Sequence, residues 1–241
     1  MRRFLSVSAP ILALLCLLSV TQLSAADAAA AGKQLSLLDL YILAGPVEYI
    51  LTVLSLISFS LCIQWTLTIK HDVLIPEGLA DEMHNIMAEG ATDEAVENAR
   101  ALVANDRSML GNIMAAALDK KDYGYDTMKE AAEIVGASES NKYLSKVGWL
   151  SMFASSATLG GLLGTVSGII GSFLKMASAP GGADPLMLAA NIGEALVCTG
   201  TGLAIAIINL YFFFWLRQRV NACTLDAAIL SSEILDYFRS R

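Results

Sequence analysis

The stretch from Ala154 to Phe173 is apolar enough for a lipid bilayer, yet it is crowded with glycine and hydroxyl side chains and carries no charge. Read as a helix, it places Gly160, Gly164 and Gly168 at intervals of four residues. This small-xxx-small spacing lets another helix approach closely inside a membrane. We therefore expect a membrane helix that packs against other helices, and we expect this glycine face to mediate oligomerisation.

Hydroxyl side chains recur every seven residues along the same helix, at Ser151, Thr158, Thr165 and Ser172. Seven residues make nearly two turns of an α-helix, so the four hydroxyls form one stripe. We expect the stripe to face protein or water. Periodicity alone favours a packing role, in which each hydroxyl bonds a carbonyl of its own helix.

The overall composition is that of a membrane protein. The chain has 241 residues, of which 55% are hydrophobic and 16% charged, and its mean hydropathy is +0.57. Its four cysteines have no paired spacing, and His71 and His84 are thirteen residues apart, so we predict neither a disulfide framework nor a metal site. No nucleophile or phosphate-loop motif is present in the sequence. We expect no enzyme activity, no cofactor and no nucleic-acid partner.

The N-terminus has the three parts of a signal peptide: two arginines, an apolar core at residues 11–20, and small residues before a plausible cleavage site near Ala26. We therefore predict a signal peptide at residues 1–26. The core, about ten residues long, is too short to span the hydrocarbon layer comfortably, which argues against an uncleaved anchor. The sequence alone leaves cleavage itself open.

Three later segments are long enough to cross a bilayer, and we predict transmembrane helices at 46–69, 147–176 and 186–216. The first is apolar except for Glu48 and Gln64.

Basic residues border these segments on one side: Lys70 follows the first, Lys146 precedes the second and Arg217 follows the third. Lysine and arginine mark the cytoplasmic ends of membrane helices, so the mature N-terminus is predicted to be periplasmic. The resulting layout has a periplasmic segment at 27–45, a cytoplasmic helical domain at 70–146, a periplasmic loop at 177–185 and a cytoplasmic C-terminal helix at 217–241.

The region from 70 to 146 contains fifteen acidic and eight basic residues, a balance that equals the chain's net charge of −7. No proline interrupts residues 126–146, so we expect one helix to run from there into the second span. The predicted fold is an all-α membrane protein with three transmembrane helices, the second and third extended into a cytoplasmic helical domain. Apolar residues at helical spacing predict its core: Val96, Ala99, Leu102, Val103, Leu110, Ile113, Met114 and Ala117.

The third span carries an acid, Glu194, on a face of small and polar residues. A charge at membrane depth costs at least about 2.5 kcal/mol, so Glu194 should face a bundle interior or a cavity. The other residues of this face are Asn191, Ala195, Cys198, Thr199, Gly202, Ala206 and Asn209.

Two motifs in this order resemble those of the MotA/TolQ/ExbB proton channel family. LGGLLGTVSGIIGSF at 159–173 resembles the family's second-helix motif, and NIGEALVCTGTGLAIAI at 191–207 resembles the third-helix motif. The resemblance covers residues 45–241. It implies that Thr165 and Thr199 are pore threonines and that Glu194 is the third-helix glutamate. The chain departs from the family pattern at Ser167, Cys198 and Asn209.

The resemblance implies an ExbB/TolQ-like subunit of an ion-driven motor in a bacterial inner membrane, coupling ion flow to work across the periplasm. It implies a pentamer around the helices of an ExbD or TolR-like partner, with a TonB-like protein as a possible further partner. The uncharged second span offers hydroxyls but no group that titrates, so a partner aspartate would supply one. We predict an ion pathway through Thr165, Thr199 and Glu194, flanked by Thr158 and Ser172, and helix packing through Gly160, Gly164, Gly168 and Gly202.

Two other functions stay open. A structural scaffold without ion conduction would use the glycines and hydroxyls only for packing, but it gains little from burying Glu194. A motility stator of the MotA kind would show four spans, and three are predicted. The sequence leaves open whether the ion is a proton or sodium, which envelope process is energised, and which genes encode the partners.

Overall fold

A computed structural model describes residues 45–88, 92–104, 106–178 and 185–239. The predicted signal peptide, the segment from 27 to 44 and most of the predicted loop at 177–185 lie outside the described residues. Within the described residues the regular structure is helical, without a strand. The fold is therefore the predicted all-α class.

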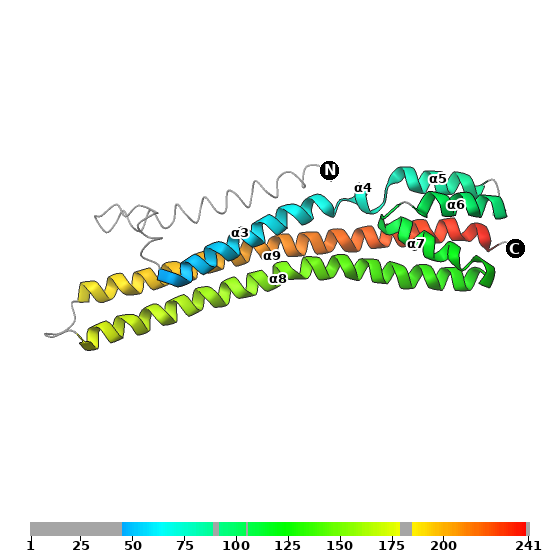
Figure 1. The fold of residues 1–241 in the computed structure, drawn as a ribbon. Helices are drawn as coiled ribbons and strands as arrows, with labels where there is room; N and C mark the ends of the chain where they lie inside the picture. Colours follow the sequence, from blue (N-terminus) through cyan, green and yellow to red (C-terminus); the bar gives the residue numbers. More distant parts are fainter. Residues whose placement is uncertain (1–44, 89–91, 105, 179–184, 240–241) are drawn as a thin grey trace. The chain divides into compact units, whose positions relative to one another are not determined.

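Three of the helices are long and apolar enough to cross a membrane: α3 at Gly45–Thr68, α8 at Tyr125–Ser178 and α9 at Pro185–Leu235 (Figure 1). The α8 helix includes the predicted span 147–176 and α9 includes 186–216, whereas α3 ends one residue before the end of the predicted span 46–69. Both α8 and α9 continue well beyond their apolar part, as predicted. The α8 helix begins directly after Gly124, whose φ of +92° is a conformation that glycine adopts at little cost.

Short helices connect α3 to α8. They are α4 at His71–Leu74, α5 at Glu77–Ala88, α6 at Asp93–Ala104, α7 at Met109–Asp119 and a 3-10 turn at Lys121–Tyr123; a second 3-10 turn, Asp236–Phe238, follows α9. The N-terminus of α7 is capped by Ser108, whose hydroxyl accepts a hydrogen bond from the Gly111 amide at 3.0 Å.

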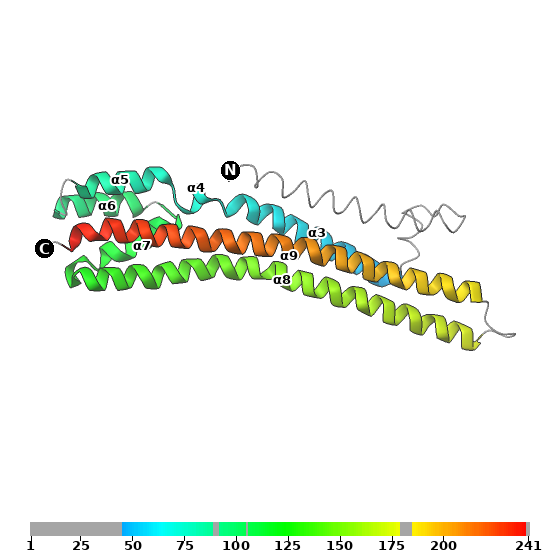
Figure 2. The ribbon, with the colours of Figure 1, turned by 180° about the vertical axis from the view of Figure 1, so that it is seen from behind.

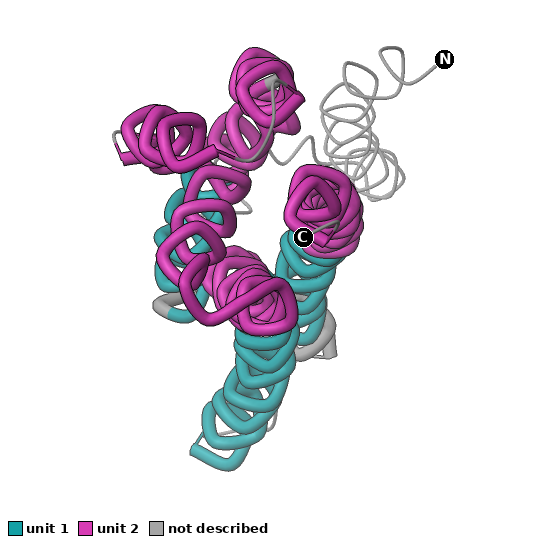
Figure 3. The backbone as a smooth tube through the Cα atoms, turned by 90° about the vertical axis from the view of Figure 1, so that its right-hand side faces the viewer, with its two compact units in different colours: residues 1–61, 150–212 teal, residues 62–149, 213–241 magenta. Residues whose placement is uncertain are grey.

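The chain divides into two compact units, and the three long helices contribute to both (Figure 3). Of the described residues, unit 1 comprises those within 45–61 and 150–212, and unit 2 comprises those within 62–149 and 213–239. In unit 1, the described parts of α3, α8 and α9 lie side by side (Figures 1 and 2).

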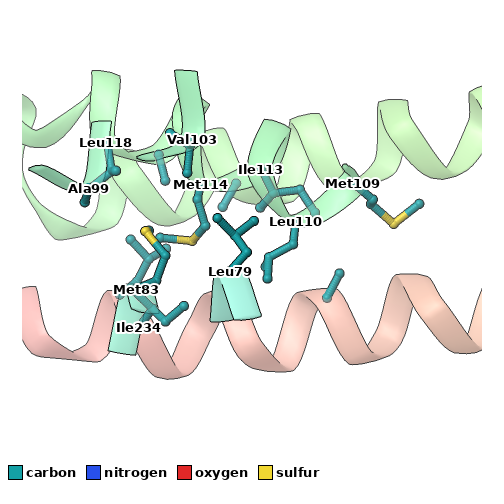
Figure 4. Close-up of a cluster of buried hydrophobic side chains, with 14 of the residues drawn as sticks. Leu79, Met83, Ala99, Val103, Met109, Leu110, Ile113, Met114, Leu118 and Ile234 are labelled. Carbon is teal, nitrogen blue, oxygen red and sulfur yellow. The ribbon is translucent and has the colours of Figure 1, made fainter. Parts of the chain in front are cut away.

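Unit 2 has a hydrophobic core built from its short helices together with the beginning of α8 and the end of α9 (Figure 4). Methionines 83, 109 and 114 are fully buried in it. The apolar pattern that predicted this core is confirmed: seven of the eight residues are buried, and Leu102 is partly buried against them. These helices are amphipathic because each buries one face against the others.

Candidate functional site

In unit 1, α8 and α9 approach each other so closely that their backbones touch at two glycines. A Cβ atom at Gly202 would lie 2.6 Å from the carbonyl oxygen of Ala157 and 3.0 Å from the Cα of Gly161. A Cβ atom at Gly161 would lie 3.0 Å from the carbonyl oxygen of Cys198. Gly161 was not singled out from the sequence, because it stands outside the four-residue spacing of its neighbours.

The three glycines of the predicted small-xxx-small face meet other helices of the same chain. A Cβ atom at Gly164 would collide with the Cys198 sulfur, and one at Gly168 would lie 2.6 Å from the Ala195 Cβ. At Gly160 it would meet the Leu51 side chain of α3 at 3.0 Å. At Gly164 and Gly168 the contacting helix is therefore α9 of the same chain. A second copy of the chain was expected at this face.

These contacts define an antiparallel register between α8 and α9. Gly161 lies opposite Thr199 and Gly202, and Gly168 lies opposite Ala195. Thr165 is four residues beyond Gly161, which corresponds to about 6 Å along the helix axis. The two predicted pore threonines therefore lie within about one helical turn of the same level.

The hydroxyls of the predicted stripe donate hydrogen bonds to carbonyls of their own helix. Thr165 donates to Leu162 at 2.7 Å, Ser172 to Gly168 at 2.7 Å, and Thr158 to Ala154 at 3.1 Å. Thr165 and Ser172 are buried within the chain, whereas Thr158 is exposed. A donating hydroxyl keeps its oxygen lone pairs, so it can still accept a bond from a proton carrier or contact a cation.

Thr199 behaves differently because its hydroxyl crosses to the neighbouring helix. It donates a hydrogen bond to the carbonyl of Gly161 at 2.9 Å. Its oxygen remains available as an acceptor, as in Thr165.

Glu194 lies on α9, one residue before Ala195, which packs against Gly168. Its side chain is outside the described part of the structure, and its place in an ion pathway stays a prediction.

A different acid is buried in unit 1. Glu48 of α3 is 5% exposed, and its Oε2 accepts a hydrogen bond from the Thr201 hydroxyl of α9 at 3.0 Å. The thiol of Cys198 is a second hydrogen-bonding group beside this carboxylate. In the sequence, Glu48 stands out only as an acid in an otherwise apolar span, and a lone acid in such a segment is the signal that points to this site.

A second polar contact joins the same two helices. Asn209 of α9 is 3% exposed, and its Nδ2 donates to the Ser58 hydroxyl of α3 at 3.2 Å and to the Ile205 carbonyl at 2.8 Å. This contact links α3 to α9 within unit 1.

The described residues contain no cluster of three or more histidine, cysteine, aspartate or glutamate side chains that could hold a metal ion.

Comparison with known proteins points to one family. The MotA/TolQ/ExbB proton channel family matches residues 105–228, about half of the chain, which include α7, all of α8 and most of α9. An ExbB-like biopolymer transport protein of Synechocystis sp. is 28% identical over 209 residues, covering 84% of this chain and 74% of that protein. The biopolymer transport protein ExbB of Xanthomonas campestris pv. campestris (strain B100) is 28% identical over 125 residues, covering 52% of this chain and 47% of its own length. The chain spans about half the length of this second relative.

The membrane helices, their two motifs and the match to the family over residues 105–228 together lead to one conclusion: the chain belongs to the MotA/TolQ/ExbB proton channel family.

Proposed function

We propose that this chain is the ExbB/TolQ-like subunit of an ion-driven motor in a bacterial inner membrane. It passes protons down their gradient and couples this flow to work across the periplasm, such as transport at the outer membrane. The relatives named ExbB support the subtype. The membrane potential can supply energy for this work, since each charge that crosses 100 mV releases about 2.3 kcal/mol.

One observation carries this proposal: in a chain of a proton channel family, Thr165 and Thr199 lie within about one turn of the same level on adjacent apolar helices. In a symmetric ring of subunits, such a pair would repeat as a belt of hydroxyls. Glu194 would lie about five residues nearer the periplasmic end of α9, where it would serve as the entrance to the pathway.

The proposal includes a partner. The apolar stretch of α8 at 154–173 has no side chain that titrates, and hydroxyls alone do not hold a proton at neutral pH. A carboxylate on an ExbD or TolR-like single-span partner, enclosed by a pentamer of this chain, would supply that group. A TonB-like protein would then transmit the resulting motion. In this arrangement unit 2 is cytoplasmic and the α8–α9 loop is periplasmic.

Proton flux into vesicles that contain this chain and its ExbD-like partner tests the proposal. Thr165→Val and Thr199→Val keep the side-chain volume but remove the hydroxyl, so each should abolish flux while the complex still assembles. Thr165→Ser and Thr199→Ser are the matched controls and should conduct. Glu194→Gln should slow ion entry without blocking assembly.

A structural scaffold is the second candidate. It is favoured by the backbone partners of the hydroxyls, above all by the bond from Thr199 to Gly161. A scaffold predicts that the valine variants, once assembled, support envelope function as well as the wild type does. Equal function in both valine variants would show that the two hydroxyls are packing groups. Envelope function without any proton flux through the wild-type complex would replace the motor proposal with the scaffold.

A further inference from the structure

Glu48 is a carboxylic acid buried in the apolar helix α3. It is 5% exposed, and its described surroundings come from two neighbouring helices. On α9, Thr201 donates to it at 3.0 Å and the Cys198 thiol lies beside it. On α8, a Cβ atom at Gly164 would contact both Cys198 and Val47. A glycine of α8 therefore lies next to these two neighbours of Glu48.

The packing of the three helices puts Glu48 deep in the apolar part of unit 1, although it is only the fourth residue of α3. Its neighbour Val47 meets α8 at Gly164, which is fourteen residues, or about 21 Å, from the end of α8 at Ser178. Its partner Thr201 is sixteen residues, or about 24 Å, from the start of α9 at Pro185. Figure 1 shows this beginning of α3 beside α8 and α9, set back from the ends that their loop joins.

The described residues supply no positive charge to Glu48. All ion pairs among them lie in unit 2. The described side chains that hydrogen-bond the carboxylate are the Thr201 hydroxyl and the Cys198 thiol, both from α9. On α3 itself, the Thr52 hydroxyl donates to the backbone carbonyl of Glu48. Glu194 is seven residues before Thr201 on α9, about 10 Å along the axis. An ionised carboxylate without a cation is costly in such a place, and taking up a proton removes the cost.

The hydrogen bonds around Thr201 fit both states of the acid. Its hydroxyl oxygen lies 3.0 Å from Glu48 Oε2 and 3.0 Å from the Cys198 carbonyl oxygen, but it has one hydrogen to donate. When Glu48 carries a proton, the acid can donate to Thr201 while Thr201 donates to Cys198, so both contacts are bonds. When Glu48 is ionised, the hydroxyl can rotate to donate to the carboxylate, with the thiol as a second donor. The exchange needs only the rotation of one hydroxyl.

We propose that Glu48 is a proton-binding site on the ion path that this subunit itself supplies, with Thr201 as the hydrogen-bonding partner that accommodates both the protonated and the ionised acid. The inference rests on the proposed function for the path, and it adds a proton carrier to a subunit in which the apolar stretch of α8 at 154–173 offers only hydroxyls. A sodium ion fits this site poorly. Hard cations take several oxygen ligands, whereas the two described side chains that bond the carboxylate are one hydroxyl and one thiol, and a thiol is a soft ligand.

Carbodiimide labelling tests proton binding directly, because dicyclohexylcarbodiimide reacts with protonated carboxyl groups in apolar surroundings. The full-length wild-type protein is purified in detergent, labelled over a range of pH at which it stays folded, and mapped by mass spectrometry. Glu48 should be labelled at neutral pH, labelling should fall reversibly as the pH rises, and added sodium should not protect it. Glu139 is the internal control: it is 7% exposed but pairs with Lys142, so it should stay unlabelled.

Two variants test whether this site belongs to the path. Glu48→Gln has nearly the same shape and can still bond Thr201, but it cannot release a proton. In vesicles with the partner it should lower proton flux roughly a hundredfold, the lower end of what one positioned acid or base contributes to a proton transfer. Glu48→Asp keeps the carboxyl group and should retain measurable flux. Absence of labelling at every pH, protection by sodium, or wild-type flux in Glu48→Gln would each overturn the proposal.

The two proposals fail in different ways. If Glu48 is unreactive while the Thr165→Val and Thr199→Val variants lose flux, this inference fails and the proposed function stands. If Glu48 is labelled as expected while the valine variants conduct like the wild type, the hydroxyl pathway fails and Glu48 stands as a proton-binding site.

Discussion

The hydroxyl of Thr199 on α9 donates a hydrogen bond to the backbone carbonyl of Gly161 on α8, across 2.9 Å. The bond lies beside the closest contact of the two helices, where Gly202 and Gly161 touch without intervening side chains. The residue that resembles a pore threonine is therefore also a link between two membrane helices. Variants of Thr199 need a stability measurement as well as a flux measurement.

Thr199→Val should lower the free energy of unfolding by about 0.6–1.7 kcal/mol, the usual range for a hydrogen bond between membrane helices. Thr199→Ser keeps the donor and should stay close to the wild type. Denaturant unfolding in detergent micelles, followed by circular dichroism, measures both. Equal stability of the two variants would mean that this bond does not hold the helices together.

Gly202→Ala should destabilise unit 1, because its new Cβ would lie 2.6 Å from a backbone oxygen of α8 that cannot easily move. Such overpacking typically costs about 1–3 kcal/mol. Gly200→Ala is the matched control on the same helix: no atom lies within 4 Å of its Cβ position, and alanine is the better helix former by up to about 1 kcal/mol. Thermal melts should show a lower midpoint for the first variant only; a shared midpoint would contradict the close approach of the backbones.

The contact between Asn209 and Ser58 should appear as a coupling energy in a double-mutant cycle. Asn209→Ala and Ser58→Ala each remove one side of the 3.2 Å bond between α9 and α3. We expect a coupling of about 0.6 kcal/mol and at most about 1.7 kcal/mol, the range measured between membrane helices. Strictly additive effects would show that the two side chains are only neighbours.

The proposed orientation predicts different accessibility for two exposed positions. Ser178→Cys at the end of α8 should react with a membrane-impermeant maleimide applied from the periplasm, whereas Glu97→Cys on α6 should react only after the inner membrane is opened. The background is low because the described cysteines, Cys62, Cys198 and Cys223, are buried. The reverse pattern of labelling would invert the topology.

The glycine spacing of α8 shows what a local sequence pattern can and cannot predict about helix packing. It predicted that α8 packs closely against another helix, because small residues four apart expose the backbone on one face. It did not identify the neighbour: Gly164 and Gly168 meet α9 of the same chain, and Gly161, outside the pattern, also makes a close backbone contact with α9. Which helix covers a face depends on residues far away in the sequence.

The sequence by itself determined the all-α class, the three long apolar helices and the extension of α8 and α9 beyond them, since length, hydropathy and the absence of proline act locally along each helix. The family motifs likewise marked Thr165 and Thr199. Only the tertiary structure decided which polar groups meet. Glu48 stands near the start of α3, and a local pattern places it at the edge of a span. In the structure, α3 packs against α8 and α9 through contacts such as that of Leu51 with Gly160, and this packing places Glu48 beside Thr201. The offset between neighbouring helices follows from side-chain packing and not from helical periodicity.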